Sequence, residues 1–185
     1  MEDSDLVAET LTSLQQRTGL DPGVVDDVIM GCVMQVGEQA VNVARNAVLA
    51  AGWPDGVPGT TVDRQCGSSQ QATTMATAMV ASGVVDIAIG CGVEAMSRVP
   101  IGVAGKKEFG LGVPVPPTYF PRYEMTSQFE GAERIADHWG ITRADTDLFG
   151  YNSQQRAARA WAEDRFAGQY LEVTAPDVDE NGNLL

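Results

Sequence analysis

Cys66 is the residue whose type and setting point most directly to chemistry. It stands between a short apolar segment, 60–62, and a segment of helical character that begins near residue 70. A thiol at the start of a helix meets free N–H groups and the positive end of the helix dipole, and both favour the reactive thiolate. Gly67 and the two serines after it are small and can present N–H donors, and Arg64 adds a positive charge nearby. The pattern fits a catalytic nucleophile, and it also fits an inert thiol packed ahead of a buried helix.

A cysteine nucleophile normally works with a base, most often a histidine. The sequence contains one histidine, His138. It falls beside an apolar stripe formed by Ile135 and Trp139, where we expect a partly exposed helix residue rather than a site residue. The residues therefore supply a nucleophile without an evident base.

A glycine motif, GCGVEA at residues 90–95, matches the G-x-G-x-x-A fingerprint of dinucleotide-binding folds. That fingerprint must open a helix, but Pro100 and Gly102 follow within a few residues. We therefore expect these glycines to allow close backbone packing at the end of a core strand.

Metal-binding patterns are weak. Asp177, Asp179, Asn181 and Gly182 match the first positions of a calcium-binding EF-hand loop, but the glutamate required at position 12 would fall beyond Leu185. A polar hairpin turn explains the segment better. The three cysteines, at positions 32, 66 and 91, form no C-x-x-C pair, so a zinc ribbon is excluded and no metal site is expected.

Short apolar runs that alternate with helical patterns predict the elements that position Cys66. This alternation is typical of an α/β fold with parallel strand pairing. The predicted helices are 4–19, 41–51, 70–81, 131–139 and 143–166, and the predicted strands are 28–33, 60–62, 84–89 and 172–174. The helix at 70–81 has no charged residue, which predicts burial on all sides.

Composition excludes several classes of protein. The formal net charge is −13 over 185 residues, and the few basic residues form no stripe, which argues against nucleic-acid binding and anionic membrane surfaces. No apolar run approaches the roughly 18 residues that span a bilayer. An odd number of cysteines and an acidic N-terminus predict reduced thiols and a cytoplasmic location.

Five segments resemble the thiolases, the acetyl-CoA C-acyltransferases. TVDRQCGSSQQA at 61–72 is similar to their nucleophile segment, and GVEAMS at 92–97 to their second signature. NVAR at 42–45 fits the helix between, and AERIA at 132–136 with SQQRA at 153–157 resembles the loop-domain helices. The matches keep family order and spacing over nearly the whole chain. The nucleophile segment looks most like bacterial enzymes that degrade fatty acyl or steroid side-chain thioesters.

The resemblance implies a role for Cys66. In thiolases the thiolate attacks the 3-keto carbon of a 3-ketoacyl-CoA, acetyl-CoA leaves, and coenzyme A then takes the acyl group from the cysteine. The Cys66 backbone N–H would serve as one oxyanion donor. Gln128 and Phe129 would fall on the wall of the acyl-CoA pocket. Cys91 and Phe129 stand where glycine is usual. Coenzyme A enters as a substrate, and no bound cofactor or metal is implied.

The resemblance also implies a fold and an assembly. We expect part of a thiolase fold, with residues 1–95 forming an N-terminal domain of mixed sheet and flanking helices that lacks its first strand. Residues 96–185, which begin with a proline-rich stretch, would form a truncated loop domain. Thiolases associate as homodimers or homotetramers, and residues 60–63 would lie near a two-fold interface.

The motifs that carry the activating histidine and a second cysteine of thiolases belong to their C-terminal half and are not found in these 185 residues. We therefore expect a thiolase chain that needs the C-terminal half for activity. The alternative is a non-catalytic thiolase-like chain that binds acyl-CoA or a partner subunit.

Overall fold

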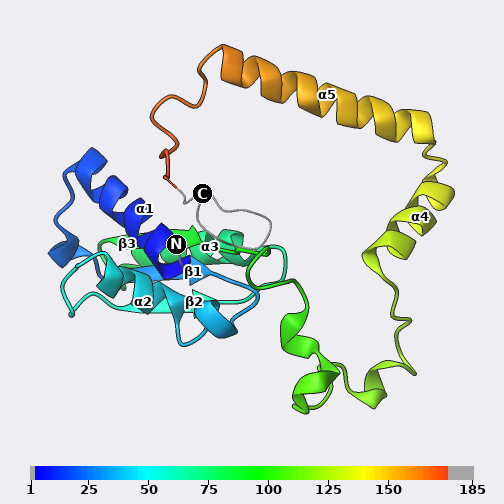
Figure 1. Ribbon diagram of the computed structural model, residues 1–185, viewed down its shortest axis with the longest axis horizontal. Coiled ribbons are helices and arrows are strands. Elements are labelled where there is room, and N and C mark those ends of the chain that lie inside the picture. The colour runs from blue at the N-terminus through cyan, green and yellow to red at the C-terminus, as the bar shows by residue number, and fades with distance from the viewer. Residues whose placement is uncertain (1–2, 175–185) are drawn as a thin grey trace, which may run out of the picture. The chain divides into compact units, whose positions relative to one another are not determined.

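The computed structural model describes residues 3–174, which divide into two compact units. The first unit holds the chain up to Phe109 together with the described residues 172–174, and the second runs over Gly110–Leu171. The elements of the first unit are α1 (Asp3–Thr18), β1 (Asp27–Gly31), α2 (Val43–Ala50), β2 (Gly59–Val62), α3 (Ser68–Ala81) and β3 (Ala88–Gly92) (Figure 1). The second unit contains α4 (Gln128–Trp139) and α5 (Arg143–Ala162). The α/β fold predicted from the sequence is confirmed.

The strands form a parallel sheet in the order β2-β1-β3. In the register, Ile29 of β1 lies opposite Thr60 of β2 and Gly90 of β3. Because the chain crosses over by α2 and then by α3, all three strands end at the same edge of the sheet. Cys66 follows β2 at that edge.

The pleat of β1 divides the core into two sides, because successive side chains point to opposite faces of a sheet. Val28 and Met30 are fully buried in a cluster that includes Val7 of α1 and Val48 of α2. Ile29 faces the other way and packs on α3, in a second cluster with Ala72 and Ala76. Helices α1 and α2 therefore cover one face of the sheet, and α3 covers the other.

Glycines on the α3 side of the sheet let that helix approach closely. A Cβ atom built on Gly31 would lie 2.3 Å from the carbonyl carbon of Ser68, and one on Gly92 would lie 1.8 Å from the Ser69 hydroxyl. A Cβ on Gly90 would lie 2.8 Å from the Cα of Thr73. The glycines of the motif at 90–95 thus serve helix–sheet packing, as expected, and no helix opens after them within the described segment 93–102.

The third predicted strand was misplaced. The apolar run at 84–89 predicts a strand there, but β3 spans Ala88–Gly92. The Val84 N–H instead bonds the Met79 carbonyl, which ends α3, and the Asp86 and Ile87 N–H groups bond the Asp26 carboxylate. The start of the run therefore serves as a helix end and a loop.

Two further expectations were wrong. Helix α3 is buried along one face only, since Thr74, Thr77 and Val80 are exposed to solvent. The sheet supplies one covering layer, and no described residue covers the opposite face. Residues 172–174 form no strand, because no described segment pairs with them; the proposed hairpin and calcium-like positions at 177–182 lie outside the described residues.

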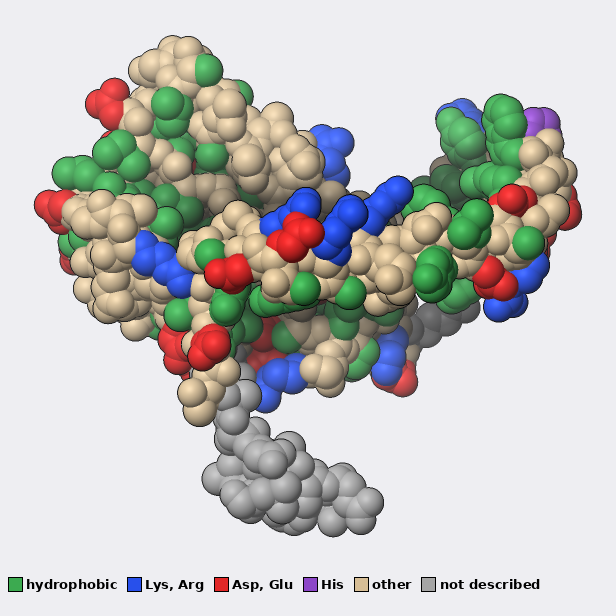
Figure 2. Space-filling model, turned by 90° about the horizontal axis from the view of Figure 1, so that it is seen from above, with side chains coloured by type: hydrophobic (Ala, Val, Ile, Leu, Met, Phe, Trp, Pro, Cys, Tyr) green, Lys and Arg blue, Asp and Glu red, His purple; other side chains and the backbone are tan. Residues whose placement is uncertain are grey.

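Local capping defines the helices of the second unit. The Ser127 hydroxyl accepts from the Glu130 N–H at the start of α4, and Thr142 forms a reciprocal capping box with Asp145 at the start of α5. None of the described residues from Gly110 to Leu171 is buried. Figure 2 shows hydrophobic side chains at the surface around the single histidine, and those of α4 include Ile135 and Trp139.

Within the described residues, no helix combines the length and apolar character needed to cross a membrane.

Candidate active site

Cys66 lies in a tight turn that links β2 to α3. The Gly67 N–H donates to the Arg64 carbonyl at 2.7 Å, which makes Cys66 the third residue of a four-residue turn. Its φ is +61°, a left-handed conformation that such turns usually reserve for glycine or asparagine. A left-handed non-glycine residue is strained by about 1–3 kcal/mol, and such strain clusters at functional sites. The thiol is exposed to solvent.

The Ser68 side chain closes this turn. Its hydroxyl accepts from the Arg64 N–H at 3.1 Å and donates to the Arg64 carbonyl at 3.2 Å. Ser68 is the first residue of α3 and is only 7% exposed. One hydroxyl therefore joins both backbone groups of Arg64 to the start of the helix, and Cys66 lies inside the loop that this closes.

The packing of α3 fixes where that loop sits. The peptide between Ser68 and Ser69 rests directly against Gly31, so the start of α3 is held at the end of the central strand. Ligand sites of open parallel sheets lie at this carboxyl edge. The exposed thiol of Cys66 is thus presented where the fold class places its chemistry.

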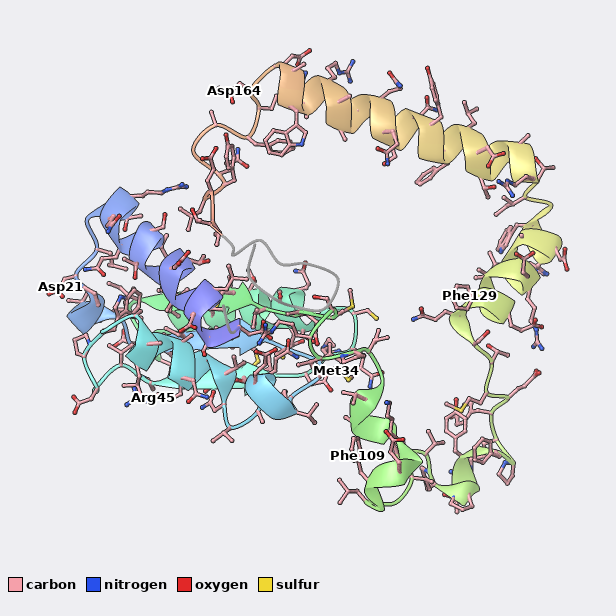
Figure 3. All side chains as sticks on the ribbon, viewed as in Figure 1. Asp21, Met34, Arg45, Phe109, Phe129 and Asp164 are labelled. Atoms are coloured by element: carbon pink, nitrogen blue, oxygen red, sulfur yellow. The ribbon has the colours of Figure 1, made fainter. Side chains whose placement is uncertain are left out.

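A second set of contacts joins the loops that follow β1 and β3. The Glu94 carboxylate accepts from the Val33 N–H at 2.7 Å and from the Met34 N–H at 3.0 Å. Gln39, which is fully buried, donates to the Met34 carbonyl and accepts from the Ala95 N–H. Met34 is labelled at this end of the sheet in Figure 3. The second signature segment, 92–97, therefore ties two loops together at the carboxyl edge.

The other two thiols are protected. Cys32 is fully buried, and burial, with Glu94, Asp3 and Asp63 nearby, raises the pKa of its thiol to about 12. Burial raises the pKa of the Cys91 thiol to about 11. A neutral, enclosed thiol is a poor nucleophile, so Cys66 is the thiol that the fold leaves available for reaction.

The remaining candidates lie in the second unit. Gln128 is the first residue of α4, and Phe129 follows it with its ring exposed to solvent (Figure 3). His138 lies on the exposed surface of α4, as expected, with its ring 5.2 Å from that of Trp139. Among the described residues, no group of three or more acidic, histidine or cysteine side chains could hold a metal ion.

The fold agrees with what known proteins show. The family model for the thiolase N-terminal domain matches residues 1–184. The chain belongs to the thiolase family. It spans less than half the length of the curated thiolases that it matches, which align with it through 43% to 49% of their own sequences.

Relatives within the thiolase family include a steroid 3-ketoacyl-CoA thiolase and beta-ketoadipyl-CoA thiolases. The chain is 41% identical over 175 residues to the steroid 3-ketoacyl-CoA thiolase FadA6 of Mycobacterium tuberculosis, covering 91% of this chain and 43% of that protein. It is 39% identical over 183 residues to a beta-ketoadipyl-CoA thiolase of Pseudomonas aeruginosa, covering 92% and 45%. The crystal structure of an acetyl-CoA acetyltransferase from Bacillus anthracis superposes with a TM-score of 0.80 at 30% identity, covering 97% of this chain and 47% of that one.

Sequence reasoning missed two residues that hold the loops at this edge of the sheet. Ser68 was noted only as a small neighbour of the thiol, although a hydroxyl next to a helix start is a recognisable turn-closing group. Gln39 carries no motif at all, and its role emerges only because the fold buries its amide between two loops.

Proposed function

We propose that this chain supplies the nucleophile of a thiolase reaction, the cleavage of a 3-ketoacyl-CoA by coenzyme A or the reverse condensation. The observation that carries the proposal is the exposed Cys66 thiol, held in a left-handed turn at the carboxyl edge of the sheet. Membership of the thiolase family supports acyl-CoA chemistry. The names of the relatives favour a degradative substrate, such as a fatty acyl, steroid side-chain or dicarboxylic acyl thioester.

The first chemical step uses atoms of this chain. The Cys66 thiolate attacks the 3-keto carbon, and the bond between C2 and C3 breaks. The acyl group stays on the sulfur, and the electron pair leaves with the enolate of acetyl-CoA, which must gain a proton. Coenzyme A then attacks the thioester carbonyl and releases Cys66. The backbone N–H of Cys66 supports this as a donor to the oxyanion.

The proton transfers need groups from outside these 185 residues. Protonation of the enolate requires an acid, and activation of coenzyme A requires a base. The one histidine of the chain, His138, is an exposed residue of α4 and matches neither family position. We therefore propose that the complete site needs the C-terminal half that the relatives possess, and that Gln128 and Phe129 belong to its acyl-CoA pocket.

The assembly proposed with this function is a homodimer or homotetramer. Strand β2 is an edge strand of the described sheet, and an edge strand can pair with another chain through its free backbone groups. Residues 60–63 would then lie near the two-fold axis. Coenzyme A and acyl-CoA are the proposed small-molecule partners.

Iodoacetamide tests the nucleophile. We expect it to alkylate Cys66 first, because Cys32 is buried, Cys91 is partly buried, and both thiols carry raised pKa values. Peptide mapping after a short exposure gives the order. Modification of Cys32 or Cys91 ahead of Cys66 would contradict the proposal.

Acetoacetyl-CoA cleavage tests the need for outside groups. We expect no measurable turnover by the purified 185-residue chain, since each missing acid–base group removes a factor of about 10²–10⁴. Loss of the enolate absorbance is the readout, and Cys66→Ser is the control. Robust turnover that disappears in Cys66→Ser would show that the chain provides its own base, and His138→Gln would then identify it.

A further inference from the structure

The strained conformation of Cys66, the proposed nucleophile, needs a restraint that keeps it in place. Backbone strain persists only where the surrounding structure opposes relaxation. At Cys66 the turn hydrogen bond from Gly67 to Arg64 restrains one side of the loop. The remaining restraint on this loop is the Ser68 hydroxyl, which bonds both backbone groups of Arg64.

We propose that Ser68 is a positioning residue, whose hydroxyl holds the Arg64–Ser68 loop closed so that Cys66 stays in the left-handed conformation and its thiol stays exposed. This inference rests on the proposed role of Cys66 as the nucleophile. Ser68 itself donates nothing to a reacting group; it acts on the reaction through the backbone of Arg64.

The Ser68 hydroxyl can make both of the hydrogen bonds that this positioning role requires. The hydroxyl donates to the Arg64 carbonyl and accepts from the Arg64 N–H at the same time. Serine and threonine offer both functions in one small group. Alanine offers neither, so removal of the hydroxyl breaks both bonds and leaves the Arg64 carbonyl with the Gly67 N–H alone.

Helix α3 cannot replace the Ser68 hydroxyl as the restraint on Cys66. Because Gly31 allows the Ser68–Ser69 peptide to rest on the central strand, the start of α3 is fixed in place. The loop between β2 and α3 is then anchored at both ends, and only its interior can relax. Relaxation of Cys66 to negative φ would turn the Cα–Cβ bond and move the sulfur away from its exposed position.

The experiment compares the alkylation rate of Cys66 by iodoacetamide in the full chain and in three variants. Ser68→Ala removes the hydroxyl, and Ser68→Thr retains it. Ser82→Ala is the matched control, because it removes a hydroxyl from the other end of α3, where it bonds only the Met79 carbonyl of the same helix. The buried thiol of Cys32 and the partly buried thiol of Cys91 report any general loosening of the fold within the same samples.

We expect Ser68→Ala to slow the alkylation of Cys66 by roughly tenfold, since each lost hydrogen bond changes a conformational equilibrium by about two- to tenfold. Ser68→Thr should restore the rate to within about threefold, and Ser82→Ala should match the unmodified chain. If the Ser68 hydroxyl restrains Cys66 alone, Cys32 and Cys91 should stay unlabelled in all variants. Hydroxyl rescue at Cys66 with protected core thiols is a combination that a purely structural role would not produce.

Three outcomes would overturn the inference or its basis. A wild-type rate in Ser68→Ala would remove the positioning role and leave Cys66 as the nucleophile. If Ser68→Ala exposes Cys32 and Cys91, Ser68→Thr decides the matter: a folded threonine variant with a slow Cys66 would contradict a role for the hydroxyl. If Cys66 is not the first thiol labelled in the unmodified chain, the proposed function fails and Ser68 has nothing to position.

Discussion

The two units of this chain hold their secondary structure by different means. In the sheet unit, Val28 and Met30 are completely buried and strands contact helices on both faces. In the unit of α4 and α5 no described residue is buried, although Phe149 and Trp161 are among the largest apolar side chains of the chain. Its helices are stabilised by local interactions instead, such as the capping box at Thr142 and the ion pair of Arg143 with Asp147 at 2.7 Å.

The difference in burial shows how each unit gains its stability. Burial of apolar area is the dominant stabilising contribution in folded domains, whereas caps and i,i+4 pairs contribute only tenths of a kcal/mol to about 2 kcal/mol each. The sheet unit therefore contains its own core. The apolar side chains of α4 and α5 gain their full stabilisation only when another surface covers them.

The largest expected effect separates the two units directly. Ile29→Ala removes a 1%-exposed side chain from the contact between β1 and α3 and should lower the free energy of unfolding of the sheet unit by about 2–5 kcal/mol. Phe149→Ala, at a 76%-exposed position of α5, should change it by less than about 0.5 kcal/mol. Labelling of the buried Cys32 thiol in increasing urea reports on the sheet unit alone. Equal effects would mean that the contrast in burial does not govern stability.

The next effect tests the close approach of α3 to the sheet. A Cβ on Gly31 would lie 2.3 Å from backbone atoms of Ser68 and Ser69, so Gly31→Ala should force the helix outward and cost about 1–3 kcal/mol. Gly56→Ala is the control, because nothing lies within 4 Å of the added atom and its φ is not positive. Urea unfolding gives the free energies. An unchanged Gly31→Ala midpoint would show that α3 does not rest on this strand.

A smaller effect belongs to the second unit. Thr142→Ala removes the hydroxyl that accepts from the Asp145 N–H and donates to the Asp145 carboxylate. We expect a loss of about 1 kcal/mol in the local stability of α5. Faster amide hydrogen exchange over the first turns of α5, with the sheet amides unaffected, is the measurement. Exchange that stays at the wild-type rate would show that the helix does not depend on its cap.

The smallest expected effect is at Asp26, where the test concerns the sign with which stability depends on pH. The N–H groups of Ile87 and Asp86 lower the pKa of the Asp26 carboxyl, because they bond its ionised form. This carboxylate therefore stabilises the fold above its unfolded pKa of about 3.9, and the contribution is lost as the pH falls through the lower folded value. Asp26→Asn should be less stable than the wild type at pH 7, with the gap closing below about pH 4.

Asp3 should show the opposite sign. Burial raises the pKa of this carboxyl, Glu38 and Glu94 raise it further, and Arg98 opposes them. Its contribution to stability is present at low pH and is lost as the pH rises from the unfolded pKa through the raised folded one. The stability of Asp3→Asn relative to the wild type should therefore grow with rising pH. Urea unfolding from pH 3 to pH 8 tests both variants, and slopes of equal sign would contradict the assignment.

Local signals were sufficient for much of the fold. The apolar run that contains Val28 and Met30 predicted β1, and the start of α5 followed from Thr142 and its acidic first turn. The place of Cys66 was also predictable, because a thiol between a strand and a helix is a local pattern. These features depend on neighbours in the sequence, which a reader of the sequence can see.

Features that depend on distant partners were not predictable. The strand expected at 84–89 gave way to β3 because Val84 completes α3 and Asp26, 61 residues before Ile87, holds the following loop. The buried Gln39 and the loop-closing Ser68 have ordinary local contexts, and only the folded arrangement supplies their partners.

The contact between Glu94 and the loop after β1 has a consequence for biosynthesis. The carboxylate and the Val33 N–H that it accepts from are 61 residues apart in the chain. A ribosome adds about 5–20 residues per second, so the loop waits on the order of 3–12 seconds for its partner. Strand β1 is made first among the described strands yet lies in the middle of the sheet, so its β2 neighbour is complete only after Val62 and its β3 neighbour only near the end of that interval, at Gly92. Its apolar side chains are then open to chaperones and to other nascent chains, and the sheet closes only when its last-made strand arrives.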